Sequence, residues 1–290
     1  MGKVTDILNN SNEPVTICDF SPPKGSDPLL QCNAASLDAT FLSTAYSPGQ
    51  SVRVDPAMLA YTIRKLTQKE VIFTLATRDM NKLAIQNHLL GANLLGLENV
   101  LIVGGDAFSK INLASIKSVK DFTTTQLIAA TKSMNLGQDY SGRKLLTSTN
   151  FCVGATINLG NNIQEESILT HKKVVAGADF FVTQPIYDTE ILERFQDNYS
   201  ILNERFATPL FVGLQILASN SPTFGKVPTK IKKELESGRD GVSIAMELYD
   251  KFVSKGFRNI YLIPPIFKGG TRDYNSAQTL LSYMITKLEK

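Results

Sequence analysis

The first acidic residue with a chemical role to consider is Asp19, which lies in an apolar run that reads Cys18-Asp19-Phe20-Ser21-Pro22-Pro23. An unpaired carboxylate in such a dry setting costs several kcal/mol, so its presence needs a reason. One reason is proton donation, a task to which a partly buried acid is suited. The other is structural, since Asp side chains also cap turns of the Pro-Pro kind. The sequence leaves both interpretations open.

Three further polar sites follow apolar runs that are typical of buried strands. Leu101-Ile102-Val103 is followed by Gly104-Gly105-Asp106, where two glycines allow a flat ligand or its phosphate to approach the backbone and Asp106 to face it. Gln184 follows Phe180-Phe181-Val182-Thr183, and its amide offers a donor and an acceptor to a heterocycle edge. Gln215 ends another apolar run and has a weaker claim. Each glutamine has the alternative of bonding a neighbouring loop.

Two other pairs have competing structural explanations. Arg78-Asp79 comes directly after an apolar run, and Asp79 either contacts a ligand or caps the helix expected from Asn81. Lys172 and Lys173 come near the end of an expected helix, where they either complement the helix dipole or reach a phosphate. His88 falls on the apolar face of a helix and is expected to be a core residue.

The elements that must position these residues are short apolar strands alternating with longer segments of helical period, which indicates βα units around a parallel sheet. The strands are nearly continuously apolar, as expected of strands buried on both faces. We predict eight of them, at 15–20, 39–45, 70–76, 100–103, 152–157, 180–183, 210–215 and 259–263.

Helices are predicted between these strands, and several end at a glycine, namely Gly96, Gly177 and Gly256. The predicted helices span 55–66, 81–95, 123–134, 164–176, 189–198, a lysine-rich segment after Pro228, 241–255 and 274–288. Eight strands with interleaved helices, and no G-x-G-x-x-G after the first, favour a single-domain (β/α)₈ barrel over residues 1–290. We expect 106–123 to be a long loop over the active face and 134–149 to be irregular.

Composition excludes several classes of protein. The 290 residues are 43% hydrophobic and 20% charged, with a formal charge of +3, as in an ordinary globular domain. The only short basic group is Lys230, Lys232 and Lys233, so no nucleic-acid surface is expected. No apolar run is long enough to span a bilayer, and the first residues lack a secretory core, so we expect a cytoplasmic protein. Three scattered cysteines and two histidines indicate neither a disulfide framework nor a metal site.

Three stretches resemble the methylenetetrahydrofolate reductase family. Asp19 to Lys24 is similar to the family's acidic residue followed by an aromatic residue and a Pro-Pro pair. The block that begins at Thr77-Arg78-Asp79-Met80-Asn81 and ends at Gly104-Gly105-Asp106 is the longest match. The run from Lys173 to Gln184 is the most specific. Together the stretches cover most of the chain in the family's order.

The resemblance implies a flavin-containing (β/α)₈ barrel that reduces 5,10-methylenetetrahydrofolate to 5-methyltetrahydrofolate by hydride transfer from reduced flavin, with FAD as the expected cofactor. Asp19 takes the place of the family's proton-donating glutamate, and Asp106 lies near the flavin and the pterin. Gln184, and by position Gln215, contact the folate. The remaining residues expected at the flavin are Gly104, Gly105, Glu166 and Lys173.

The chain departs from the family pattern at three places. The usual glutamate is shortened to Asp19, a Tyr-Pro-Glu-x-His segment is replaced by Ala155 to Gly160, and the basic residue before the Gly-Asp pair is replaced by Gly104. The flavin is therefore FAD, FMN or absent. The electron donor is NAD(P)H or a redox partner subunit, and an oligomer is expected. The alternatives to a reductase are a pterin-binding barrel active in methyl transfer and a partner-dependent subunit without its own flavin.

Overall fold

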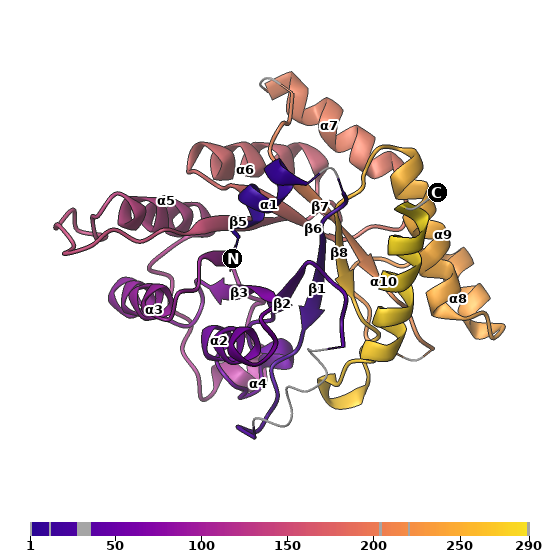
Figure 1. Cartoon of the computed structure of the whole chain (residues 1–290), viewed down its shortest axis with the longest axis horizontal. Helices are drawn as coiled ribbons and strands as arrows, with labels where there is room; N and C mark the ends of the chain where they lie inside the picture. The colour runs from indigo at the N-terminus through magenta and orange to yellow at the C-terminus, as the bar shows by residue number, and fades with distance from the viewer. Residues whose placement is uncertain (1, 12, 28–35, 203–204, 220, 289–290) are drawn as a thin grey trace.

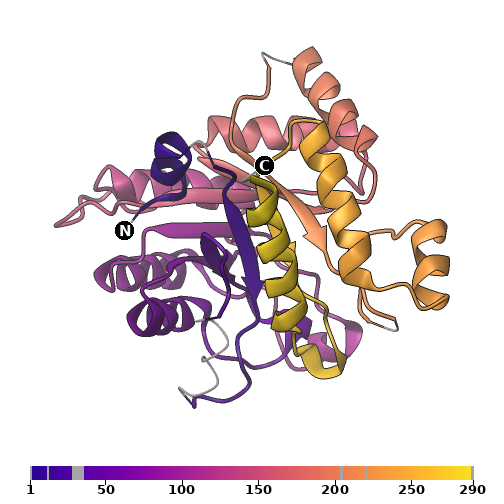
Figure 2. The same cartoon turned by 45° about the vertical axis from the view of Figure 1, so that its right-hand side comes forward.

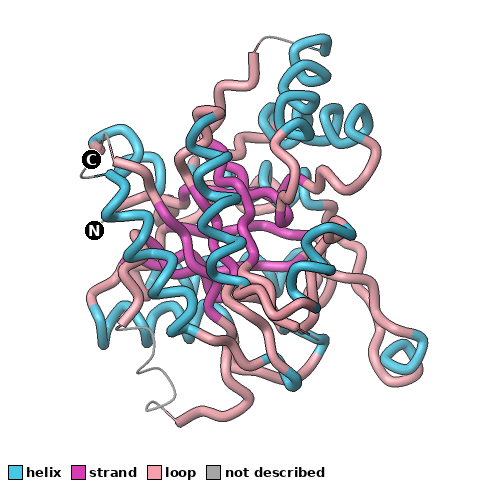
Figure 3. Tube along the Cα trace, turned by 90° about the vertical axis from the view of Figure 1, so that its right-hand side faces the viewer, coloured by secondary structure: helices cyan, strands magenta, loops and turns pink. Residues whose placement is uncertain are grey.

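The eight predicted strands form a closed parallel barrel in which each strand pairs with its neighbours in the sequence and β8 closes on β1. The computed structural model describes residues 2–11, 13–27, 36–202, 205–219 and 221–288. Helices surround the strands on the outside, as Figure 1 and the tube in Figure 3 show. The predicted single (β/α)₈ barrel is therefore confirmed.

The strands lie close to their predicted positions. Each is buried on both faces, so its sequence is a nearly continuous apolar run that marks where the strand begins and ends. They are β1 Thr16–Phe20, β2 Phe41–Thr44, β3 Glu70–Ala76, β4 Asn99–Val103, β5 Cys152–Ile157, β6 Phe180–Pro185, β7 Leu210–Gln215 and β8 Ile260–Ile263. Nearly every residue in these strands is buried. β6 runs two residues past its predicted end, through a register shift against β7 between Val182 and Pro185.

Each predicted helix is present, and most begin at a side chain that caps the backbone. The longer helices are α2 Pro56–Thr67, α3 Lys82–Leu94, α5 Thr124–Asn135, α6 Ile163–Val175, α7 Glu190–Leu202, α8 Thr229–Glu236, α9 Gly241–Ser254 and α10 Tyr274–Leu288. The three predicted glycine stops all have positive φ, as expected where a helix ends. Figure 2 shows α10 beside β1, where the rings of Phe20 and Tyr274 stack at 4.8 Å.

Side chains alternate between two hydrophobic cores. The larger core fills the layer between the strands and the helices, and the smaller one fills the barrel interior with residues such as Phe41, Phe180 and Phe211. Gly154 faces this interior, where any added side chain would collide with the Phe180 ring. The interior of the barrel is thus packed rather than hollow, and a ligand can enter only at an end.

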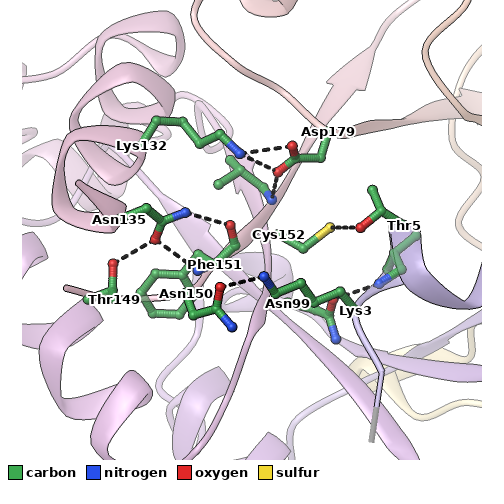
Figure 4. Close-up of polar contacts among 12 residues, drawn as sticks. Lys3, Thr5, Asn99, Lys132, Asn135, Thr149, Asn150, Phe151, Cys152 and Asp179 are labelled. Atoms are coloured by element: carbon green, nitrogen blue, oxygen red, sulfur yellow. Dashed lines mark hydrogen bonds and ion pairs between the residues drawn. The ribbon is translucent and has the colours of Figure 1, made fainter.

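A short helix that was not predicted, α1 Val4–Asn10, closes the end of the barrel where the strands begin. Val4 is fully buried in the interior core. Asn99 at the start of β4 accepts a hydrogen bond from the Val4 amide at 2.9 Å, while Thr5 contacts the Cys152 thiol and Lys3 reaches Asn150 (Figure 4). Because α1 covers the end of the barrel where the strands begin, a ligand can reach the barrel only at the end where the strands finish.

The two long connections both contain more order than predicted. Residues 106–123 do lie beyond β4, but they include the helical turn α4 Lys110–Leu113. Residues 134–149 carry an antiparallel bridge between Gln138 and Lys144. Among the described residues, no helix is both long and apolar enough to cross a membrane.

Candidate functional site

The open end of the barrel holds a cavity of about 410 Å³ at the carboxyl ends of the strands. This volume falls within the range of pockets that hold a small organic ligand. Five of the predicted residues are among those that line it: Asp19, Gly104, Gly105, Asp106 and Gln184. The fold therefore brings together side chains from β1, β4 and β6 that are far apart in the sequence.

Asp19 lies deep in this cavity and is paired. Its side chain is 7% exposed, and one carboxylate oxygen accepts a hydrogen bond from Arg272 Nε at 3.0 Å, in an ion pair whose arginine side chain is 3% exposed. The other oxygen accepts a bond from the Tyr261 hydroxyl at 3.2 Å. Burial first, and then the charge of Asp19, raise the pKa of Tyr261, so this hydroxyl stays protonated and donates. Asp19 is thus a supported anion in the cavity wall, and these two hydrogen bonds are not those of a turn cap.

Gln184 owes its position to the irregularity between β6 and β7. Thr183 accepts a hydrogen bond from the Gly213 amide at 2.8 Å and donates to the Gln184 carbonyl, which fixes the shifted register. A side chain at Gly213 would stand only 2.6 Å from the Thr183 carbonyl oxygen. The bulge leaves the Gln184 amide at the cavity without a side-chain hydrogen bond to any described residue, and bulges commonly re-aim a side chain in this way.

At β4 the two glycines and Asp106 form an exposed edge of the cavity. An added side chain at Gly104 would meet nothing within 4 Å, whereas Gly105 has a φ of +78° and lies against Arg78. Arg78 donates to the Asp106 backbone carbonyl at 2.8 Å, and the charge of the Asp106 carboxylate acts on Arg78. The edge is therefore open and carries an acid whose carboxylate has no hydrogen bond to a described residue.

Arg78 and Asp79 form an ion pair with each other, and neither caps a helix. They form two hydrogen bonds, at 2.6 and 2.7 Å, and Arg78 stacks over the Phe108 ring at 4.2 Å. The helix is capped by Asn81 instead, so the capping role considered for Asp79 is wrong. Burial and Asp79 together raise the pKa of Tyr46, which also lines the cavity.

The other predicted residues lie outside the cavity lining. Lys173 and Glu166 are both buried on α6 behind β5, where their charged atoms are 3.6 Å apart and Lys173 also donates to the Thr156 carbonyl. Burial lowers the pKa of Lys173, and the negative charge of Glu166 acts in the opposite direction. Gln215 holds the following loop: it accepts from the Phe224 amide at 2.9 Å and donates to the Pro222 carbonyl at 3.0 Å.

Several lining residues were not predicted, and some had no detectable signal in the sequence. Arg272 and Tyr261 stand 253 and 242 residues from the acid they contact. Asn158 and Thr156, at the end of β5, could have been found by the strand-end argument that identified Gln184. Among the buried residues the structure describes, Cys18 and Cys152 are free thiols as expected, and Cys32 lies outside the described residues.

A (β/α)₈ barrel with polar groups around a cavity at the carboxyl ends of its strands is the arrangement of barrel enzymes and ligand-binding barrels. The family model for methylenetetrahydrofolate reductase matches residues 3–262. The chain belongs to this family. No curated protein sequence matches the chain significantly.

Solved structures share the fold at low sequence identity. An uncharacterised protein from Clostridium thermocellum that binds two copies of 5-methyl-5,6,7,8-tetrahydrofolic acid is 13% identical, with a TM-score of 0.68 and 99% of each chain covered. A long-chain alkane monooxygenase is 9% identical, with a TM-score of 0.58 over 96% of this chain and 92% of that one. Dihydropteroate synthase from Thermus thermophilus is 13% identical, with a TM-score of 0.50 over 95% of both chains.

The methylenetetrahydrofolate reductase family is generally flavin-dependent, so the lining residues can be compared with what a flavin needs. The open edge at Gly104 suits a flat ring, because no side chain covers it. The phosphate groups of FAD or FMN have no comparable place. The described cations that line the cavity are Arg78 and Arg272, and both are held by carboxylates. The residues thus fit the ring of a flavin and do not fit its phosphates.

Proposed function

We propose that the protein is a folate C1 oxidoreductase that reduces 5,10-methylenetetrahydrofolate to 5-methyltetrahydrofolate, with a reduced flavin as the expected hydride donor. The observation that carries this proposal is the meeting of Asp19, Asp106 and Gln184 in one cavity of a barrel of this family. The Clostridium thermocellum barrel, which binds 5-methyltetrahydrofolate, adds support for a folate ligand.

The cavity offers the groups that a pterin needs. The polar edge of a pterin carries N–H donors beside a carbonyl acceptor, and it pairs with acceptor-only carboxylates and with amides. Asp106 is an exposed carboxylate at the rim, and the Gln184 amide supplies both a donor and an acceptor. In this arrangement the two residues orient the pterin so that its reacting carbon faces the open edge at Gly104.

Asp19 is the group placed to handle the proton. When the five-membered ring of methylenetetrahydrofolate opens, the departing nitrogen gains a proton, and in the reverse reaction it loses one. Asp19 lies within the cavity and accepts a hydrogen bond from the Tyr261 hydroxyl. As a carboxylate it accepts the proton that the nitrogen loses in the reverse reaction; in the forward reaction it first takes a proton from water that enters the cavity and then gives that proton to the nitrogen. Arg272 holds the carboxylate in place for this exchange.

The test is an assay of the purified protein with methylenetetrahydrofolate and reduced flavin, beside an absorption spectrum taken with and without added flavin. Asp19→Asn is expected to lower turnover by about 10²-fold or more at unchanged folate affinity, as on loss of a general acid. Gln184→Ala is expected to weaken folate binding by about fivefold, the value of one hydrogen bond of about 1 kcal/mol.

Matched controls are Asp197→Asn and Gln138→Ala, which change the same residue types outside the cavity lining. Both controls should behave as the unmodified protein. Unchanged activity and binding in Asp19→Asn and Gln184→Ala would remove the basis for the assignment. Folate binding without any reduction would instead point to methyl transfer or to a subunit that depends on a partner.

A further inference from the structure

Proteins hold phosphate groups mainly with unengaged cations and with free helix N-termini. Among the residues that the structure describes, the cations that line the cavity are engaged. Arg78 is bound bidentately by Asp79, and Arg272 is paired with Asp19. Arg53 lies among the loops at the open end of the barrel. Its guanidinium donates hydrogen bonds to the backbone carbonyls of Pro22, Pro48 and Gly269. None of these three arginines has two adjacent N–H groups free to bind a phosphate.

The helix N-termini at this end of the barrel are engaged as well. Each of the following side chains accepts hydrogen bonds from the first turn of its helix: Asp55, Asn81, Thr123, Asn162, Asp188, Asp240 and Asp273. α6, which follows β5, also has Glu165 and Glu166 in its first turn. Among the described α-helices at this end the exception is α8, which has no side-chain cap but contributes no residue to the cavity lining. The 3-10 turns Pro48–Gln50 and Lys268–Gly270 also lack a side-chain cap, but each is a single turn whose last amide donates to the backbone carbonyl of its own N-cap residue.

The place where (β/α)₈ barrels most often bind phosphate is acidic in this chain. That place is formed by the loops after the seventh and eighth strands and an adjoining helix N-terminus. Here it is a cavity of about 270 Å³ lined by Asp240 and Asp273. Its arginine, Arg239, is bound by Glu234 and Glu247. A side chain at Gly241 would collide with the Leu217 carbonyl, so the backbone is closed at the helix start.

From these three observations we infer that the cavity binds its redox carrier, a flavin or a pyridine nucleotide, through contacts with the ring alone. The phosphates of FAD, FMN or a pyridine dinucleotide then contribute nothing to the binding free energy. The inference rests on the proposed folate C1 oxidoreductase function, because it names the kind of carrier that this cavity accepts. A carrier held in this way exchanges readily and is not a resident cofactor. The carboxylates around the mouth favour the donor-rich edge of a pterin over an anion.

The test compares ligands that share a ring and differ in phosphate. Riboflavin, FMN, FAD and ADP are titrated into the purified protein by calorimetry or flavin fluorescence. We expect FMN and FAD to bind within about threefold of riboflavin, and ADP to show no binding at about 1 mM; a single phosphate contact of ordinary strength would add about tenfold or more. FAD or FMN that binds more than about tenfold tighter than riboflavin would overturn the inference.

A gain of affinity can be built at Gly104. This position is exposed, has no positive φ, and has open space for a side chain. Gly104→Lys adds one unengaged cation at the cavity edge, and its side chain also covers part of the surface assigned to the ring, so the readout is a ratio: we expect the affinity for FMN and FAD relative to riboflavin to rise by about tenfold. Gly91→Lys is the control, because Gly91 on α3 is equally uncrowded but lies outside the cavity lining.

Titration of 5-methyltetrahydrofolate separates this inference from the proposed function. If the folate binds and the flavin phosphates add nothing, both stand. If the folate binds and the phosphates add tenfold or more, the inference fails alone. If Gly104→Lys leaves the ratio of FMN to riboflavin affinity the same as in Gly91→Lys, the cavity edge is not where the ring lies, and the inference fails. If no folate binds, the proposed function fails whatever the flavins do.

Discussion

Removal of Arg272 tests the central ion pair of the site most directly. In Arg272→Met the Asp19 carboxylate keeps the Tyr261 hydrogen bond but loses its cation, in a place where both partner side chains are less than a tenth exposed. Loss of one partner of a buried pair costs about 3–5 kcal/mol, and the lower end applies because the pair lines a cavity that water can enter. In a chain of this size about 3 kcal/mol corresponds to a fall in Tm of about 5 °C.

The assay is denaturant and thermal unfolding of four proteins: the unmodified chain, Asp19→Asn, Arg272→Met and the double variant. Because the double variant leaves no unpaired charge, we expect it to be more stable than Arg272→Met by at least about 1 kcal/mol. Arg239→Met, which breaks a pair whose arginine is 33% exposed, is the control and should cost less than about 1 kcal/mol. Additive effects of the two site variants, or a cost for Arg272→Met no larger than the control, would refute the buried-pair argument.

Three other changes have expected outcomes. Gly213→Ala should lower the unfolding free energy by about 1–3 kcal/mol through its collision with backbone, and should weaken folate binding by displacing Gln184; normal binding in calorimetry would speak against the bulge as the positioning element. Burial raises the pKa of the Cys152 thiol from 9.0 to about 11, so the stability it contributes is complete below pH 9 and lost as pH rises toward 11. Cys152→Ala should flatten that part of the stability curve in urea titrations, and an unchanged slope would contradict the assignment. Arg53→Met should raise the KM for folate several-fold, measured by steady-state kinetics, since it releases three loop carbonyls at the mouth; an unchanged KM would mean that the loops hold without it.

The barrel was predictable because its strands are buried on both faces, which produces short apolar runs that differ plainly from the helical segments. β3, β5 and β7 begin and end where predicted. α1 was missed because it is only seven residues long and of mixed polarity, and its stability comes from Asn99 and the barrel interior rather than from its own sequence. Contacts of that kind leave no periodic trace in the chain.

The site was predictable only in part, for the same reason. Strand ends identified Asp19, Asp106 and Gln184, because all parallel strands end on one side of the barrel. The sequence does not show whether a candidate side chain is already hydrogen-bonded or ion-paired within the protein. Lys173 and Gln215 looked available in the sequence, yet Lys173 is buried against Glu166 and Gln215 is saturated by a loop.

The segment beyond the family match completes the polar lining of the cavity. The family model ends at residue 262, whereas Arg272 lies in the connection after β8 and contacts the acid of β1. Arg53 donates to the Gly269 carbonyl in the same connection, so the loops after β1, β2 and β8 are held together by one guanidinium. Because the acid depends on a residue outside the matched region, two members of this family with the same strand-end residues can differ in how their acid is charged and oriented. Under the proposed function, the connection after β8 is therefore the part of the chain in which to look for differences in proton transfer between family members.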